Sequence, residues 1–172
     1  MALLEIIQYP DPRLKQKSTP VSKVDARVKT LLENMAETMY DAPGIGLAAP
    51  QIGVNERIIV VHVSEDDDDE QVGKKPGKLY KVVNPEIVHK DGEIEYEEGC
   101  LSIPGIKENV KRAAVIVVKG LDENGKPFEL EADGLLAVCF QHEIDHLDGV
   151  LFIDRLSQLK RTMIRSKLAK RG

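Results

Sequence analysis

Residues 141–146 read Gln-His-Glu-Ile-Asp-His and contain the pattern His-Glu-x-x-His. On a helix, His142 and His146 lie four positions apart and therefore on nearly the same face, so both imidazoles can bind one metal ion. Glu143 then projects about 100° away from His142. That direction suits a general base that acts on a metal-activated water molecule better than it suits a third ligand.

The residues before this pattern indicate that the helix is buried. Residues 135–140 are all apolar, Leu-Leu-Ala-Val-Cys-Phe. We expect Asp133 to cap the N-terminus of the helix, which continues through Leu147 with Gly149 beyond its end. A surface helix with two unrelated histidines is the alternative. Because buried imidazoles need a partner for their polar atoms, we favour a metal site.

A catalytic metal usually has three protein ligands and one open position. Downstream of His146 the sequence contains no histidine and no glutamate, so it lacks the third ligand of the common HExxH peptidases. Two cysteines remain. Cys139 shares the helical stripe of the two histidines, but its side chain is short and typical of a core position. Cys100 lies on a separate segment and could approach the metal from the opposite side, so we favour it while Cys139 stays open.

The elements around this helix indicate an α+β protein. Residues 24–39 carry apolar side chains at helical spacing, and Ser157 is expected to cap a last helix that extends to about Arg171. Strands are expected at 57–63, 81–83, 87–89, 94–97, 113–121 and 128–131, with a turn at 122–125. Strands precede the helix instead of alternating with helices. We therefore expect mixed or antiparallel β-sheets packed around the central HExxH helix, with an N-terminal and a C-terminal helix.

Length and composition narrow the class of protein. With 172 residues, 42% hydrophobic and 31% charged, residues 1–172 are expected to form a single domain with a packed core. Two cysteines are too few for a disulfide framework, which indicates a reducing compartment. The sequence shows no signal peptide and no apolar run of the ~18–20 residues needed to span a bilayer. We expect a cytoplasmic protein with no membrane partner.

The charge is distributed unevenly along the chain. Six of the 24 basic residues lie in residues 156–172, which contain no acidic residue, so the first 155 residues hold 18 basic against 29 acidic residues. This balance argues against binding to free DNA by the acidic body. Residues 64–78 include the acidic run 66–69 and are expected to form a solvated loop to which we assign no function.

Three segments together resemble the three signature motifs of the peptide deformylase family. They are Gly-Ile-Gly-Leu-Ala-Ala-Pro-Gln at 44–51, Glu-Gly-Cys-Leu-Ser at 98–102 and Gln-His-Glu-Ile-Asp-His at 141–146. They occur in the family's order, and the resemblance extends from about residue 3 to residue 160. Each motif alone is modest evidence, whereas the three together are specific. The resemblance implies a metal-dependent hydrolase that removes the formyl group from the N-terminal formylmethionine of new polypeptides.

The same resemblance implies the roles of the site residues. The metal ligands would be Cys100, His142 and His146, which resolves the choice between the two cysteines. Glu143 would act as general base and then general acid, and the oxyanion would be stabilised by the Gln51 side chain and the Leu101 backbone N–H. The cofactor would be one divalent metal ion, Fe(II) in the cell, with zinc, nickel or cobalt able to replace it.

The resemblance also implies a binding pocket for the formylmethionyl end of a nascent peptide. Its expected residues are Gly44, Ile45, Gly46, Glu98, Gly99, Leu135, Val138, Cys139 and His142. The two glycines of the first motif would let a peptide backbone pair like an added strand. We expect a buried Glu98 to pair with Arg112.

Two positions depart from the family pattern. Lys107 stands where many relatives have arginine, and Lys111 replaces a common proline, which leaves the substrate contacts at that rim open.

For the basic segment 157–172, the resemblance implies contact with the ribosome. The alternative is a solvated helix packed on the body.

Overall fold

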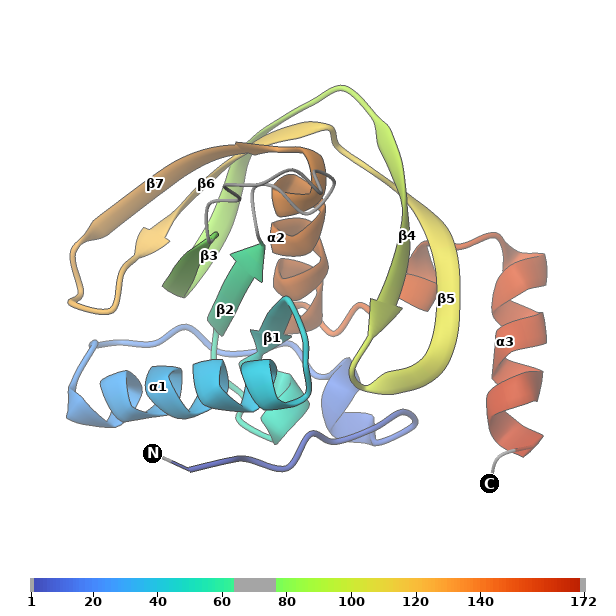
Figure 1. Cartoon of the computed structure of the whole chain (residues 1–172), viewed down its shortest axis with the longest axis horizontal. Coiled ribbons are helices and arrows are strands. Elements are labelled where there is room, and N and C mark those ends of the chain that lie inside the picture. The colour runs from blue at the N-terminus through green and yellow to red at the C-terminus, as the bar shows by residue number, and fades with distance from the viewer. Residues whose placement is uncertain (1, 64–76, 171–172) are drawn as a thin grey trace, which may run out of the picture.

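The computed structural model describes residues 2–63 and 77–170 (Figure 1). In these residues it contains three α-helices, seven β-strands and three short 3₁₀ helices. The helices are α1 (Ala26–Asp41), α2 (Gly134–Leu147) and α3 (Gln158–Lys170). The strands are β1 (Gly46–Ala48), β2 (Ile58–Val63), β3 (Lys78–Asp91), β4 (Ile94–Cys100), β5 (Ile103–Arg112), β6 (Val115–Leu121) and β7 (Pro127–Asp133). The 3₁₀ helices span Pro12–Lys15, Ala49–Ile52 and Phe152–Arg155.

The strands form two antiparallel sheets. Five strands pair in the order β1-β2-β3-β6-β7, and β4 pairs with β5 in a separate two-stranded sheet. In Figure 1, α2 stands between the five-stranded sheet and the β4–β5 pair, while α1 lies below β1 and β2. The expected α+β architecture around the HExxH helix is confirmed, with antiparallel pairing in both sheets.

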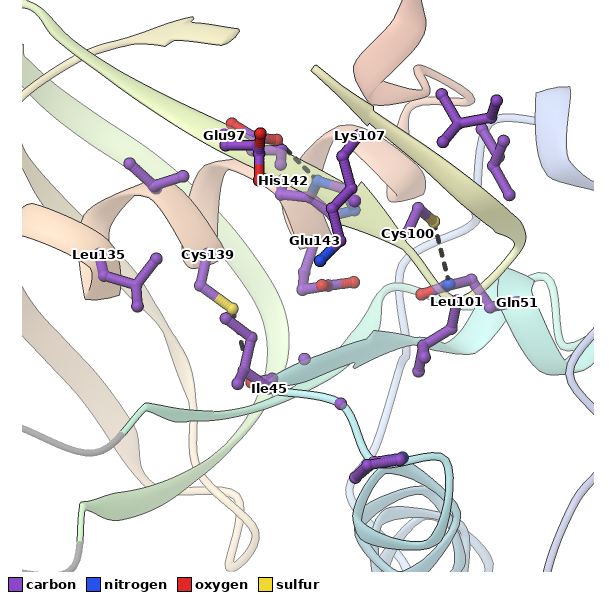
Figure 2. A pocket seen from close by; sticks show the side chains of 18 of the residues that line it. Ile45, Gln51, Glu97, Cys100, Leu101, Lys107, Leu135, Cys139, His142 and Glu143 are labelled. Carbon is purple, nitrogen blue, oxygen red and sulfur yellow. Dashed lines mark hydrogen bonds and ion pairs between the residues drawn. The ribbon is translucent and has the colours of Figure 1, made fainter. Parts of the chain in front are cut away.

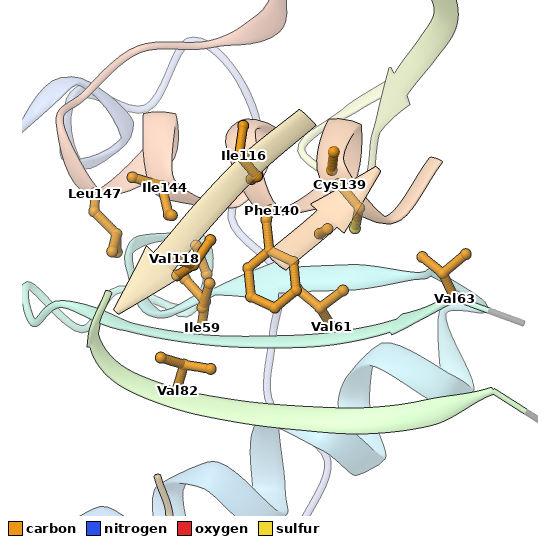
Figure 3. Close-up of a cluster of buried hydrophobic side chains, with 13 residues drawn as sticks. Ile59, Val61, Val63, Val82, Ile116, Val118, Cys139, Phe140, Ile144 and Leu147 are labelled. Atoms are coloured by element: carbon orange, nitrogen blue, oxygen red, sulfur yellow. The ribbon is translucent and has the colours of Figure 1, made fainter. Parts of the chain in front are cut away.

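Strand β2 is apolar at successive positions because both faces of the sheet are covered there. Alternate side chains of a strand point to opposite faces of the sheet. Ile58 and Val60 pack with the buried face of α1, whereas Ile59 and Val61 pack with Phe140 of α2 (Figure 3). Both faces of the sheet are therefore covered by helices at this point, and α2 is held firmly against it.

Helix α1 begins and ends close to its predicted limits. The Asp25 side chain accepts a hydrogen bond from the Val28 N–H at 3.1 Å and so caps the N-terminus. The buried side of α1 carries Leu32, Met35 and Met39. Because α1 ends just before β1, its C-terminus delivers the glycine-rich first motif to the edge of the five-stranded sheet.

The expected short strands differ from the observed ones in extent. Residues 81–83 and 87–89 belong to the single strand β3, which continues through a register shift between Val83 and Glu86. Asn84 and Pro85 lie at that shift, and in the sequence they indicate a break between two strands. The glycine-rich first motif contains β1, which was not predicted and which pairs with β2. Strand β5 was not predicted.

Helix α3 lies along the outer side of β5, next to the C-terminus in Figure 1. The Ser157 hydroxyl accepts a hydrogen bond from the Lys160 N–H at 3.3 Å, which confirms the predicted cap. Asp133 occupies the N-cap position of α2, although its side chain makes no capping hydrogen bond. Among the residues described, no helix is long and apolar enough to cross a membrane. Residues 64–76 of the expected acidic loop and Arg171 lie outside the described residues.

Candidate functional site

One thiol and two imidazoles meet between the end of β4 and helix α2. Cys100 is the last residue of β4, and His142 and His146 lie one turn apart on α2. One ligand atom from each of the three residues lies within 4.8 Å of the other two. The Cys100 Sγ is 3.4 Å from the His146 Nε2. These three groups have the spacing and the chemistry of a metal site closed from two elements.

A network of ion pairs with a buried centre supports one of the imidazoles. The Nδ1 of His142 hydrogen-bonds the Glu98 Oε1 at 2.9 Å. Both oxygens of Glu98 accept from Arg112, each at 2.9 Å, as the family resemblance implies. Arg112 also contacts Asp145, which in turn accepts two hydrogen bonds from Arg155. Burial opposes ionisation of Glu98, but the hydrogen bonds from Arg112 and His142 prevail and lower its pKa. This carboxylate therefore fixes the orientation of the His142 ring.

Of the other two candidate ligands, His146 has the character of a metal ligand and Cys139 does not. Burial lowers the pKa of His146 well below its usual range, which keeps the imidazole in the neutral form that binds metals. Burial raises the pKa of the Cys139 thiol, and its Sγ donates to the carbonyl oxygen of Ile45 at 3.5 Å. Cys139 thus behaves as a core thiol outside the group formed by Cys100 and the two histidines.

Glu143 lies beside this group with its carboxylate inside the fold. Its Oε1 is buried and has no hydrogen-bond partner among the described residues. Burial raises the pKa of Glu143 to about 7. An unpartnered carboxylate oxygen at such a place is costly unless a further group, such as a water molecule on a metal ion, satisfies it.

Gln51 approaches the site from the Ala49–Ile52 turn, and its amide is held at both ends. The Oε1 accepts from the Ala48 N–H at 2.9 Å. The Nε2 donates to the Ser102 hydroxyl at 3.1 Å and lies 3.5 Å from the Cys100 Sγ. Ser102 was not singled out in the sequence, although it ends the second motif.

A cavity of about 390 Å³ opens beside these residues (Figure 2). Every predicted site residue except His146 lines it, namely Gly44, Ile45, Gly46, Gln51, Glu98, Gly99, Cys100, Leu101, Leu135, Val138, Cys139, His142 and Glu143. His146 is only 1% exposed and lies deeper. The structure therefore gathers the three motifs, which are distant in sequence, around one cavity.

Several residues in the cavity wall were not predicted. They are Pro43, Glu97, Ile103, Gly105 and Ile106, and Lys107 lies at the same rim. Three of the five belong to β5, so their place follows from the pairing of β5 with β4. Asp145 was also missed as a partner of Arg112, and Arg155 as a second partner of Asp145. An acidic residue inside the buried third motif was the signal that a cation had to lie nearby.

A family model described as polypeptide deformylase matches residues 3–162. The chain belongs to the peptide deformylase family. The peptide deformylase of Chromobacterium violaceum is 53% identical over 171 residues, which cover 99% of this chain and 97% of the relative. Among solved structures, a peptide deformylase from Legionella pneumophila has a TM-score of 0.86 and 50% identity, covering 98% of this chain and 95% of that one.

The peptide deformylase from Ehrlichia chaffeensis in complex with actinonin has a TM-score of 0.89 and 40% identity, and covers 100% of this chain and 99% of that one. The resemblance found in the sequence is therefore confirmed over almost the whole chain. The chain is an enzyme, a metal-dependent hydrolase of the peptide deformylase class.

Proposed function

We propose that the enzyme removes the formyl group from N-formylmethionyl peptides in the cavity of Figure 2, with a metal ion held by Cys100, His142 and His146. The convergence of these three ligands beside the unpartnered carboxylate of Glu143 carries the proposal. A divalent ion bound there would act as a Lewis acid that activates a water molecule near neutral pH.

In this proposal Glu143 moves the proton. Its carboxylate accepts a proton from the attacking water and later delivers one to the nitrogen of the leaving methionine. The elevated pKa, about 7, supports both roles because the group can hold and release a proton near neutral pH. The position of Glu143 in the cavity wall, next to His142, supports this role, because a substrate bound in the cavity would lie beside it.

Two N–H groups would stabilise the oxyanion that forms on the formyl oxygen when the formyl carbon is attacked. One belongs to the Gln51 side-chain amide, whose Oε1 is already bound to the Ala48 N–H. The other is the backbone N–H of Leu101, which directly follows Cys100. Fixed donors at such a place stabilise the transition state more than the ground state.

The methionine side chain would occupy the apolar part of the cavity. Leu135, Val138 and Cys139 of α2 form one wall, and Ile45 lies at the mouth with 44% of its surface exposed. The peptide backbone would pass between the segment Gly44–Gly46 and Gly99 on β4, where the glycines leave room for strand-like pairing.

We propose ferrous iron as the native metal, following the family resemblance. One thiolate and two imidazoles also bind zinc, nickel and cobalt, so metal availability decides. Metal analysis of protein purified without oxygen tests the choice of metal.

The enzyme would work in the reducing cytoplasm, because oxidation of Cys100 would release the metal. We further propose that residues 1–172 form one catalytic domain, with 157–172 as a basic helical extension.

Hydrolysis of formyl-Met-Ala tests the site assignment. We expect Glu143→Ala to keep its metal and to lose turnover by about 10²–10⁴-fold, the usual contribution of a general base. Cys100→Ser should lose the metal, whereas the matched variant Cys139→Ser should retain it. Full turnover in Glu143→Ala would refute the proton role. Metal loss from Cys139→Ser alone would refute the ligand set. Cleavage of an unformylated protein would favour an endopeptidase instead.

We propose that residues 157–172 dock on ribosomal RNA. The segment carries six basic and no acidic residues, and Leu159 and Met163 on α3 are exposed by 71% and 63%. Removal of residues 157–172 should weaken salt-sensitive ribosome binding and spare hydrolysis of a short formyl peptide. Ribosome affinity that survives this truncation would contradict the proposal.

A further inference from the structure

The two segments that carry the proposed oxyanion donors are both hydrogen-bonded to the N-terminal stretch of the chain. The Ile7 N–H donates to the carbonyl oxygen of Gln51 at 2.8 Å. The Tyr9 N–H donates to the carbonyl oxygen of Ser102, also at 2.8 Å. Residues 7–9 thus tie the Gln51 turn to the turn that follows β4, although the two turns are about fifty positions apart in the sequence.

We infer that residues 7–9 and the Ser102 hydroxyl form a clasp that positions the Gln51 amide and the Leu101 N–H for catalysis. In this view Ser102 is a positioning residue that acts through Gln51. The inference rests on the proposed function, because it presumes that Gln51 donates to the oxyanion.

The hydroxyl of Ser102 decides which way the Gln51 amide points. A glutamine amide has two N–H donors and one carbonyl acceptor. The Ala48 N–H engages the acceptor, and Ser102 Oγ accepts one N–H at 3.1 Å. The same Nε2 donates to Cys100 Sγ at 3.5 Å, so its second N–H is directed toward the candidate metal centre. The clasp therefore aims this N–H at the place where the reacting group would bind, and it prevents the amide from flipping.

Burial makes this arrangement stiff. Ser102 is fully buried and Gln51 is 1% exposed. A buried N–H that loses its acceptor is expensive, so the amide would move to find another partner. The N-terminal segment is itself anchored, since Ile7 is buried in the core and the Leu4 N–H donates to Thr38 Oγ1 of α1 at 2.9 Å.

A loosened clasp should affect turnover more than substrate binding. Oxyanion donors work at about 2.7–3.1 Å from the charge that develops in the transition state. A small displacement of Gln51 Nε2 therefore weakens an interaction made mainly in the transition state, and KM should change little. A residue that serves only the stability of the fold would instead lower the fraction of folded enzyme without changing kcat per folded molecule.

The first test compares Ser102→Ala with Ser102→Thr in zinc-loaded full-length enzyme on formyl-Met-Ala. Removing an oxyanion donor outright costs about 10²–10³-fold in kcat, so displacing one should cost less, roughly tenfold, in Ser102→Ala. KM should stay within twofold, and Ser102→Thr, which keeps the hydroxyl, should recover most of the loss. As a readout independent of turnover, the two side-chain amide resonances of Gln51 should shift in the NMR spectrum of Ser102→Ala. An unchanged kcat in folded Ser102→Ala would overturn the inference.

Gln51→Ala, alone and with Ser102→Ala, separates the clasp from the function it serves. We expect Gln51→Ala to lower kcat and the double variant to be no slower. Normal turnover in Gln51→Ala would refute the oxyanion role in the proposed function. A loss in Gln51→Ala with none in Ser102→Ala would refute only the clasp. Losses that multiply fully in the double variant would show that Ser102 acts elsewhere.

The backbone half of the clasp is tested by removing one N–H without changing a side chain. Replacing Tyr9 with 4-hydroxyphenyllactic acid turns the amide into an ester, so the bond to Ser102 is lost. The matched control is the corresponding ester at Gln8, whose N–H donates no hydrogen bond within residues 2–63 and 77–170. The Tyr9 ester should lower kcat severalfold with KM retained, and the Gln8 ester should match the wild type. Equal kcat values for the two esters would overturn the inference.

Discussion

Gly46 shows how tightly the proposed general base is packed. A Cβ at this position would lie 2.5 Å from the Glu143 Oε2 and 2.9 Å from the Cys139 Sγ. Gly46→Ala should therefore push the carboxylate aside, lowering kcat and costing about 1–3 kcal/mol of stability, as overpacked sites usually do. Peptide hydrolysis and urea denaturation measure the two effects.

The stability control for this variant is Gly99→Ala. Its Cβ would meet the Ile106 carbonyl oxygen at 3.5 Å, an ordinary contact, so its free energy of unfolding should stay near that of the wild type. Wild-type turnover in Gly46→Ala would show that Glu143 does not need its observed position.

At the residue scale, sequence spacing predicted the two histidines and the carboxylate between them, because a helix repeats every 3.6 residues. Spacing alone left Cys100 and Cys139 as alternatives, since the path of β4 is a tertiary feature. Ser102 was missed for the same reason. Its partner Gln51 lies far away in sequence, and only the fold brings the two together.

At the scale of elements, Arg112 joins β5 to β4 and α2 through Glu98 and Asp145. Removing one member of a buried ion pair costs about 3–5 kcal/mol, so Arg112→Met should lose about that much stability. It should also weaken metal binding by about 10–100-fold, because Glu98 would no longer orient His142. Urea denaturation and competition with a zinc chelator measure these losses.

Arg155→Met is the matched control for Arg112→Met. Its side chain is 46% exposed although it binds the same Asp145, so the loss should stay within about 1 kcal/mol. Similar stabilities of the two variants would mean that burial does not govern this network.

Asn84 of β3 holds the segment that precedes α1, and it does not line the cavity. It has a positive φ of 53°, and its side chain makes two hydrogen bonds to the backbone of Val21, at 2.8 and 2.9 Å. Asn84→Ala loses both bonds and keeps the strained backbone, so we expect a loss of about 2–3 kcal/mol. Asn84→Gly should lose less, because glycine tolerates this φ. Thermal denaturation gives the order, and kcat per folded molecule should not change in either variant.

The sequence predicted some elements better than others. Helix α1 and strand β2 were predicted because their apolar patterns are not interrupted. Strand β5 was missed because Pro104, Gly105 and several charged residues interrupt its pattern, and its pairing with β4 is what makes it a strand. Pro85 similarly divided β3 in the prediction, whereas the structure continues the strand through a bulge at Asn84.

At the scale of the whole molecule, the catalytic and basic parts of the chain are separate. The described residues that line the cavity all lie between Pro43 and Glu143. Helix α3 lies outside β5 and rests on the body through Ile164, which is buried, and Leu168 (Figure 1). The net charge of −5 therefore combines an acidic catalytic body with a basic helix whose charges need not serve the reaction.

Acidic side chains of the body neutralise some basic residues of α3 and not others. This difference allows a more specific test of the proposed ribosome contact. Lys160 lies 3.2 Å from Glu108, whereas Lys167 is exposed near the end of α3. Each phosphate contact adds about 0.7–0.9 to the slope of log affinity against log salt. Lys167→Gln should therefore reduce the slope of ribosome binding by nearly one contact, and Lys160→Gln by less, because Glu108 competes with phosphate for its charge. Binding measured over a salt series gives both slopes. Identical slopes in the wild type and Lys167→Gln would place the contact elsewhere on the molecule.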